Sequence, residues 1–99
     1  GVWSNPLLGK SEGWPAPGPD AVVYLKTKGI RCVATDAPDL GGVEPRRALM
    51  TYWALGSREM VGIEFLHQVG QVPPGGYFLF APLKIRDCHG GPGRAIVLY

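Results

Sequence analysis

A single carboxylate, Glu64, stands inside an apolar stretch and is the residue of this sequence that most needs a chemical explanation. The stretch from Met60 to Leu66 reads MVGIEFL, which places Glu64 between Ile63 and Phe65. Removing an ionised carboxylate from water is unfavourable unless a proton, a hydrogen-bonding partner or a metal ion compensates for the charge. The sequence therefore predicts that Glu64 belongs to a functional site.

Two other groups of potential metal ligands give weaker signals. His67 follows Glu64 by three residues, a spacing that brings side chains together on a helix but not at the end of a strand. The side chains of the consecutive residues Asp87, Cys88 and His89 diverge, whereas zinc sites combine ligands from separated pairs. We expect a surface position for His67 and no zinc site at residues 87–89.

Asp36 ends a predicted strand, and two interpretations of it remain open. Ligand-contacting groups of α/β proteins gather at the carboxyl ends of strands, where Asp36 would lie. The alternative is that Asp36 only starts a turn with Pro38. The loop 90–94 similarly resembles a phosphate-binding loop, but it leads into a strand instead of a helix, which favours a hairpin loop.

No arrangement in the chain predicts catalysis by these 99 residues alone. Only two histidines are present, and no nucleophile-elbow motif accompanies them. Cys32 falls in a predicted buried strand, where a thiol is usually inert.

The elements that position these residues are short helices and strands. Gly29 and Gly56 are placed to end two amphipathic helices. The last two strands suit an antiparallel hairpin, and the whole suits an α/β domain with a mixed sheet. The apolar stripe expected on the second helix consists of Ala48, Leu49, Tyr52, Trp53 and Leu55. The expected elements are helices at 19–28 and 45–55 and strands at 30–35, 61–65, 77–85 and 94–99.

Residues 1–18 form an irregular segment rich in Pro, Gly and Trp, and residues 19–99 carry the predicted elements. Such a long structureless segment inside a compact domain indicates a functional loop or a missing partner surface. Because it contains Trp3 and Trp14, we expect it to pack against another surface and not to be a solvated tail.

The composition limits the class of protein. Ninety-nine residues suffice for at most one domain, and a net charge of +2 without a basic run argues against nucleic-acid binding. Neither a signal peptide nor an apolar run of membrane-spanning length is found. We therefore expect a soluble cytoplasmic protein with reduced cysteines, one disulfide being the alternative.

Three stretches resemble a known family. They are GWPAPGPDAVVYLKTKGIRCVATDAPDLGG (13–42), ALMTYWALGSREMVGIEFLHQVGQVPPGGYFLFAPLKI (48–85) and GGPGRAIVLY (90–99). They contain a helix, Gly and strand leading into an Asp-x-Pro turn, a Glu closing an apolar strand, and a Gly-Pro-x-Arg turn before the last strand. Together they resemble the C-terminal half of the cyclase or metal-dependent hydrolase family, which includes bacterial kynurenine formamidases and isatin hydrolases.

The resemblance implies a swivelling β/β/α fold in an oligomer that hydrolyses the amide bond of an aryl formamide or a cyclic amide. A zinc or manganese ion would activate the attacking water. The family's His-rich metal motif belongs to its N-terminal half, which these residues do not include. We therefore expect this chain alone to be inactive, with the remaining ligands supplied by that half or by a second chain.

The resemblance also implies roles for four residues. Glu64 matches the active-site Glu that contacts the metal or its water, Asp36 a site-organising Asp, and Arg94 a structural Arg of the last turn. The family has a His twelve residues before its Glu, where this chain has Tyr52. A tyrosine there is a poor metal ligand but can donate a hydrogen bond to a developing oxyanion. The alternative is a non-catalytic subunit, or pseudoenzyme, that acts as an interaction module.

Overall fold

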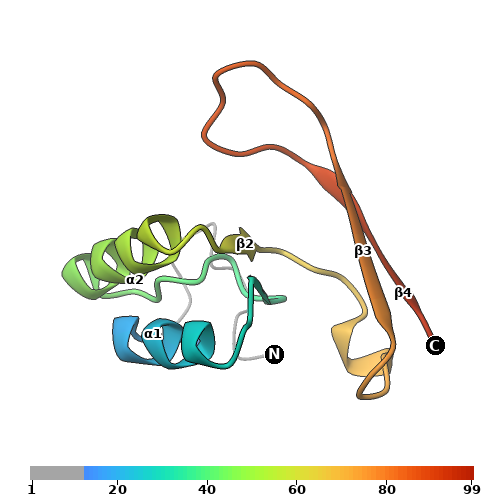
Figure 1. The fold of residues 1–99 in the computed structure, drawn as a ribbon, viewed down its shortest axis with the longest axis horizontal. Coiled ribbons are helices and arrows are strands. Elements are labelled where there is room, and N and C mark those ends of the chain that lie inside the picture. The colour runs from blue at the N-terminus through green and yellow to red at the C-terminus, as the bar shows by residue number, and fades with distance from the viewer. Residues whose placement is uncertain (1–12) are drawn as a thin grey trace. The chain divides into compact units, whose positions relative to one another are not determined.

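The structure, a computed structural model, describes residues 13–99, so that Trp3 and the rest of residues 1–12 lie outside the described residues. The chain divides into two compact units, the first ending at His67 and the second running from Gln68 to Tyr99. Helices and strands occur together, which confirms the mixed α/β class (Figure 1).

Helix α1, Pro19–Thr27, begins and ends as the sequence predicts. Pro19 occupies the first helical position, where its missing N–H is not needed. At the other end Gly29 has a φ of +79°, and Ile30 N donates to Leu25 O at 3.1 Å. This is a Schellman motif, in which a left-handed glycine satisfies the last carbonyls of the helix.

Strands β1, Cys32–Ala34, and β2, Val61–Ile63, form a two-stranded parallel sheet with Val33 opposite Gly62. Both strands are shorter than predicted. β1 ends early because Ala37 N donates to Thr35 Oγ1 at 3.0 Å and turns the chain. β2 ends before Glu64, and the following Phe65 has a φ of +57°, which a strand cannot accommodate.

Helix α2, Pro45–Ser57, connects these strands and extends beyond its predicted end. Its N-terminus is capped by the Glu44 carboxylate, which accepts hydrogen bonds from the first-turn amides. The prediction that Gly56 ends the helix is wrong. Glu59, with a φ of +55°, takes the left-handed position, and Met60 N donates to Leu55 O at 3.0 Å.

A small core lies between the two helices and the parallel sheet. Thr51 of α2 is fully buried and donates its hydroxyl to Arg47 O at 3.0 Å. The predicted apolar stripe of α2 is therefore partly wrong: Leu49 and Trp53 are 72% and 70% exposed, because the helix turns the face with Thr51 inward. The buried apolar cluster comprises Val22, Leu40, Ala54, Leu55 and Met60.

The second unit consists of a short 3-10 helix, η2, Val69–Gln71, and a hairpin. Strands β3, Tyr77–Pro82, and β4, Gly93–Leu98, pair in antiparallel register. The hairpin is as predicted, but both strands end earlier than expected. The described strands form two separate two-stranded sheets, so the expectation of one mixed sheet is wrong.

With 9 and 13 residues, α1 and α2 are both too short to cross a membrane, and no other described helix has the required length and apolar character.

The left-handed conformation of Glu59 predicts that Glu59→Gly stabilises the protein. A side chain at positive φ costs about 1–2 kcal/mol, part of which the greater freedom of glycine in the unfolded chain offsets. We expect the free energy of unfolding, measured with urea, to rise by about 0.5–1 kcal/mol. The control Glu59→Ala removes the same side chain without relieving the backbone, and an equal gain in both variants would contradict this account.

Candidate functional site

The loops that follow β1 and β2 lie side by side and place Glu64 at the carboxyl ends of two parallel strands. Beyond the strands, Phe65 N donates to Ala37 O and Leu66 N donates to Thr35 O, both at 3.1 Å. These bonds continue the pairing of the two segments past Glu64. In parallel sheets this edge is where functional groups commonly gather.

The Glu64 carboxylate is half-buried and is held by two hydrogen bonds to the same oxygen. Leu40 N donates to Glu64 Oε1 at 3.1 Å, and the hydroxyl of Tyr52, on α2, also donates to Oε1. Leu40 N reaches the Tyr52 hydroxyl oxygen as well, at 3.0 Å. The charge in the apolar stretch is thus compensated by an amide and a phenol, while Oε2 has no hydrogen-bond partner among residues 13–99.

Tyr52 keeps its proton. Burial first, and then the hydrogen bond to Glu64, raise the pKa of Tyr52 to about 12, although the hydrogen bond from Leu40 N–H acts in the opposite direction. The hydroxyl hydrogen is directed to Glu64, so that donation to an oxyanion would require this bond to break. In this arrangement Tyr52 orients the carboxylate.

Asp39 organises the loop that carries Leu40. Its Oδ1 accepts hydrogen bonds from Gly41 N at 2.9 Å and from Gly42 N at 2.8 Å. Trp14 Nε1 donates to the same oxygen at 3.3 Å and to Asp39 O at 3.2 Å. Trp14 therefore packs on the chain, as expected for that tryptophan.

Two glycines let this loop approach its neighbours closely. A Cβ at Gly41 would lie 2.6 Å from Ala48 Cβ and 2.9 Å from Tyr52 Cε2. A Cβ at Gly62 would lie 2.7 Å from Leu40 Cδ1. The loop is therefore held between α2 and β2, with Leu40 only 1% exposed.

The described residues do not form a metal site by themselves. Among residues 13–99 no group of three or more His, Cys, Asp or Glu side chains could hold an ion. No buried side-chain nitrogen or oxygen in this part of the chain lacks a hydrogen-bond partner either. Glu64 Oε2 could supply one ligand, whereas zinc sites require at least three protein ligands.

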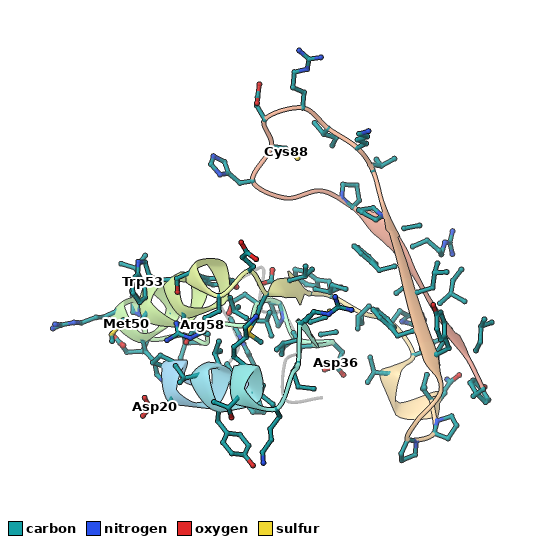
Figure 2. The ribbon with its side chains drawn as sticks, viewed as in Figure 1. Asp20, Asp36, Met50, Trp53, Arg58 and Cys88 are labelled. Carbon is teal, nitrogen blue, oxygen red and sulfur yellow. The ribbon has the colours of Figure 1, made fainter. Side chains whose placement is uncertain are left out.

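Of the remaining candidate residues, Asp36 and His67 belong to the first unit, and Arg94 and residues 87–89 belong to the second. Asp36, in the loop after β1 (Figure 2), is exposed, and no described residue donates a hydrogen bond to its carboxylate. His67 is exposed three residues after Glu64. Arg94 lies on β4 opposite Ala81, and residues 87–89 lie in the exposed turn before that strand.

Sequence reasoning did not identify Asp39, Leu40 or Trp14 as parts of the site. The run Asp-Leu-Gly-Gly at 39–42 carries a usable signal, because an Asp before glycines often accepts bonds from the amides two and three residues on. The role of Leu40 has no such signal, because the group that acts is a backbone N–H, which every residue except proline carries.

The raised pKa of Tyr52 predicts a late alkaline titration. The near-ultraviolet tyrosinate absorbance of the wild type minus that of Tyr52→Phe should titrate with a midpoint near pH 12. Because this pKa lies above the unfolded value of 10.0, the stabilisation from Tyr52 is complete below about pH 10 and is lost as the pH rises towards 12. A midpoint at or below pH 10 would contradict the hydrogen-bonded arrangement.

The close approach at Gly41 predicts that Gly41→Ala destabilises the protein by about 1–3 kcal/mol, as expected when a well-packed contact is overfilled. Urea unfolding measures the change. Gly56→Ala is the matched control, because a Cβ there meets nothing within 4 Å and alanine favours the helix by up to about 1 kcal/mol. Equal effects of the two substitutions would contradict the packing described here.

Comparisons with known proteins agree with the resemblance seen in the sequence. The chain is 37% identical over 90 residues to an isatin hydrolase of Roseibium aggregatum, a match that covers 85% of this chain. The chain spans about a third, 34%, of the length of that relative. No family model and no solved structure matches. The chain is therefore a distant homologue of isatin hydrolase that matches part of the length of that protein.

Proposed function

We propose that this chain is part of a metal-dependent hydrolase that acts on an amide bond of the aryl formamide or cyclic amide class, with Glu64 as its functional carboxylate. The observation that carries the proposal is the fixed orientation of Glu64: Oε1 is held by Leu40 N and the Tyr52 hydroxyl, and Oε2 is left without a partner among the described residues. The homology to an amide hydrolase supports it.

The chemistry assigned to this chain is proton transfer at Glu64. A carboxylate that is held at one oxygen presents the other in a fixed direction, where it can accept a proton from a water molecule attacking an amide carbonyl. Tyr52 and Leu40 N–H hold the carboxylate in that direction. In this proposal the zinc or manganese ion is bound mainly by residues outside the described part of the chain.

The second unit supports a larger assembly. On the β-hairpin, Tyr77, Leu79, Ile96 and Leu98 share one face, and the other face is also apolar, with Phe78 opposite Val97. A two-stranded hairpin is marginal alone, and strands that are apolar on both faces belong inside layered α/β folds. We propose that further polypeptide of the swivelling β/β/α fold, from the same protein or from a second chain, covers it in a homo- or hetero-oligomer.

The exposed face of α2 favours a second candidate, a non-catalytic subunit that acts as an interaction module. Met50 and Trp53 project from α2 (Figure 2), and Leu49 beside them is 72% exposed. Large apolar side chains grouped on a surface often mark a protein contact. Tyr52→His separates the candidates: a large gain in amide hydrolysis would favour the non-catalytic subunit, and a fall would favour a working role for Tyr52.

The decisive experiment uses the protein purified from its source with any chain that accompanies it. We expect elemental analysis to detect a bound divalent metal. We also expect the protein to hydrolyse isatin or N-formylaniline, with the product measured by chromatography. In Glu64→Gln the rate should fall about 10²–10⁴-fold, the usual contribution of a positioned base.

Glu59→Gln is the matched control, because it is the same substitution at an exposed glutamate that follows α2. A hydrolysis rate that is equal in the two variants, or a protein without metal and without hydrolysis of either amide, would overturn the proposed function and favour the interaction module.

A further inference from the structure

We propose that Asp39 is a positioning residue of this site: through the 39–42 loop its carboxylate fixes the Leu40 amide that holds both Tyr52 and Glu64. Trp14 assists it. The inference rests on the proposed function for its effect on hydrolysis, but the geometry can be tested without any activity.

The first step is the fixation of the loop by one carboxylate oxygen. Asp39 Oδ1 accepts bonds from the backbone of Gly41 and Gly42 at 2.9 and 2.8 Å and from the Trp14 indole at 3.3 Å. Hydrogen bonds to an ionised acceptor are about twice as strong as neutral ones. One side chain thus closes the loop on itself and ties it to a tryptophan 25 residues earlier.

The second step is the direction of the Leu40 amide. The Leu40 side chain is buried in the core cluster and lies against Gly62 of β2. The Leu40 N–H points to the pair formed by Tyr52 and Glu64, at 3.0 and 3.1 Å. The core fixes the side chain, and the Asp39 carboxylate fixes the backbone.

The third step is the consequence for the site. One N–H serves two acceptors, and these acceptors are themselves hydrogen-bonded to each other. A small rotation of the loop would therefore weaken both bonds at once and leave the carboxylate to adopt other rotamers. Asp39 has no hydrogen bond with Glu64 and reaches the carboxylate through the Leu40 amide.

The test measures hydrogen exchange of the Leu40 amide by NMR in protein labelled with ¹⁵N-leucine. The sample is the protein as purified, with any accompanying chain, and Leu40→Met identifies the signal. We expect Leu40 exchange to be about tenfold faster or more in Asp39→Ala than in the wild type, because the hydrogen bonds that hold the loop closed are lost. The Leu55 amide, inside α2, reports on folding in the same spectrum and should be unchanged.

Two further variants keep the inference testable if Asp39→Ala fails to fold. Asp39→Asn retains the Oδ1 acceptor and should restore most of the protection, and Trp14→Phe, which removes only the indole donor, should give an intermediate rate. For hydrolysis, we expect Asp39→Ala to lower kcat about tenfold with little change in KM, and Asp39→Asn to recover most of that loss.

Unchanged Leu40 exchange in Asp39→Ala, or equal acceleration in Asp39→Asn and Asp39→Ala, would overturn the positioning role. If the wild type hydrolyses no amide, the proposed function fails, while the exchange rates still decide the role of Asp39.

Discussion

One backbone amide, Leu40 N–H, is the contact on which the candidate site depends. It donates to Tyr52 and to Glu64, whose side chains come from a helix and from the end of a strand 12 residues apart in the sequence. Without it, an ionised carboxylate next to an apolar core would be held by the phenol alone. Because a partly buried carboxylate without partners is unfavourable, this shared donor is the central constraint on the first unit.

The surrounding elements can be understood as support for that amide. The core takes the Leu40 side chain, Gly41 and Gly62 allow α2 and β2 to approach the loop, and Asp39 closes it. Neither glycine that makes these contacts is a left-handed glycine, so the requirement at both positions is space and not backbone freedom. Side-chain packing, the loop geometry and the hydrogen bonds of Asp39 therefore all help to position the Leu40 amide.

Much of the first unit could be predicted from local signals. Pro19 and Gly29 marked the ends of α1, and the apolar setting of Glu64 marked a carboxylate that requires hydrogen-bonding partners. The end of α2 was wrong because Glu59 takes a left-handed conformation that side chains rarely adopt, while Gly56 remains helical. The exposure of Trp53 and the contribution of Leu40 depend on tertiary packing, which helix periodicity and residue type do not encode.

The central claim is that Tyr52 and Glu64 act as one hydrogen-bonded unit. A double-mutant cycle with Tyr52→Phe and Glu64→Gln, read out by urea unfolding, measures their coupling directly. Residues in one network show interaction energies of about 0.5–3 kcal/mol, and we predict a value of about 1 kcal/mol or more. Additive effects of the two substitutions would contradict the account.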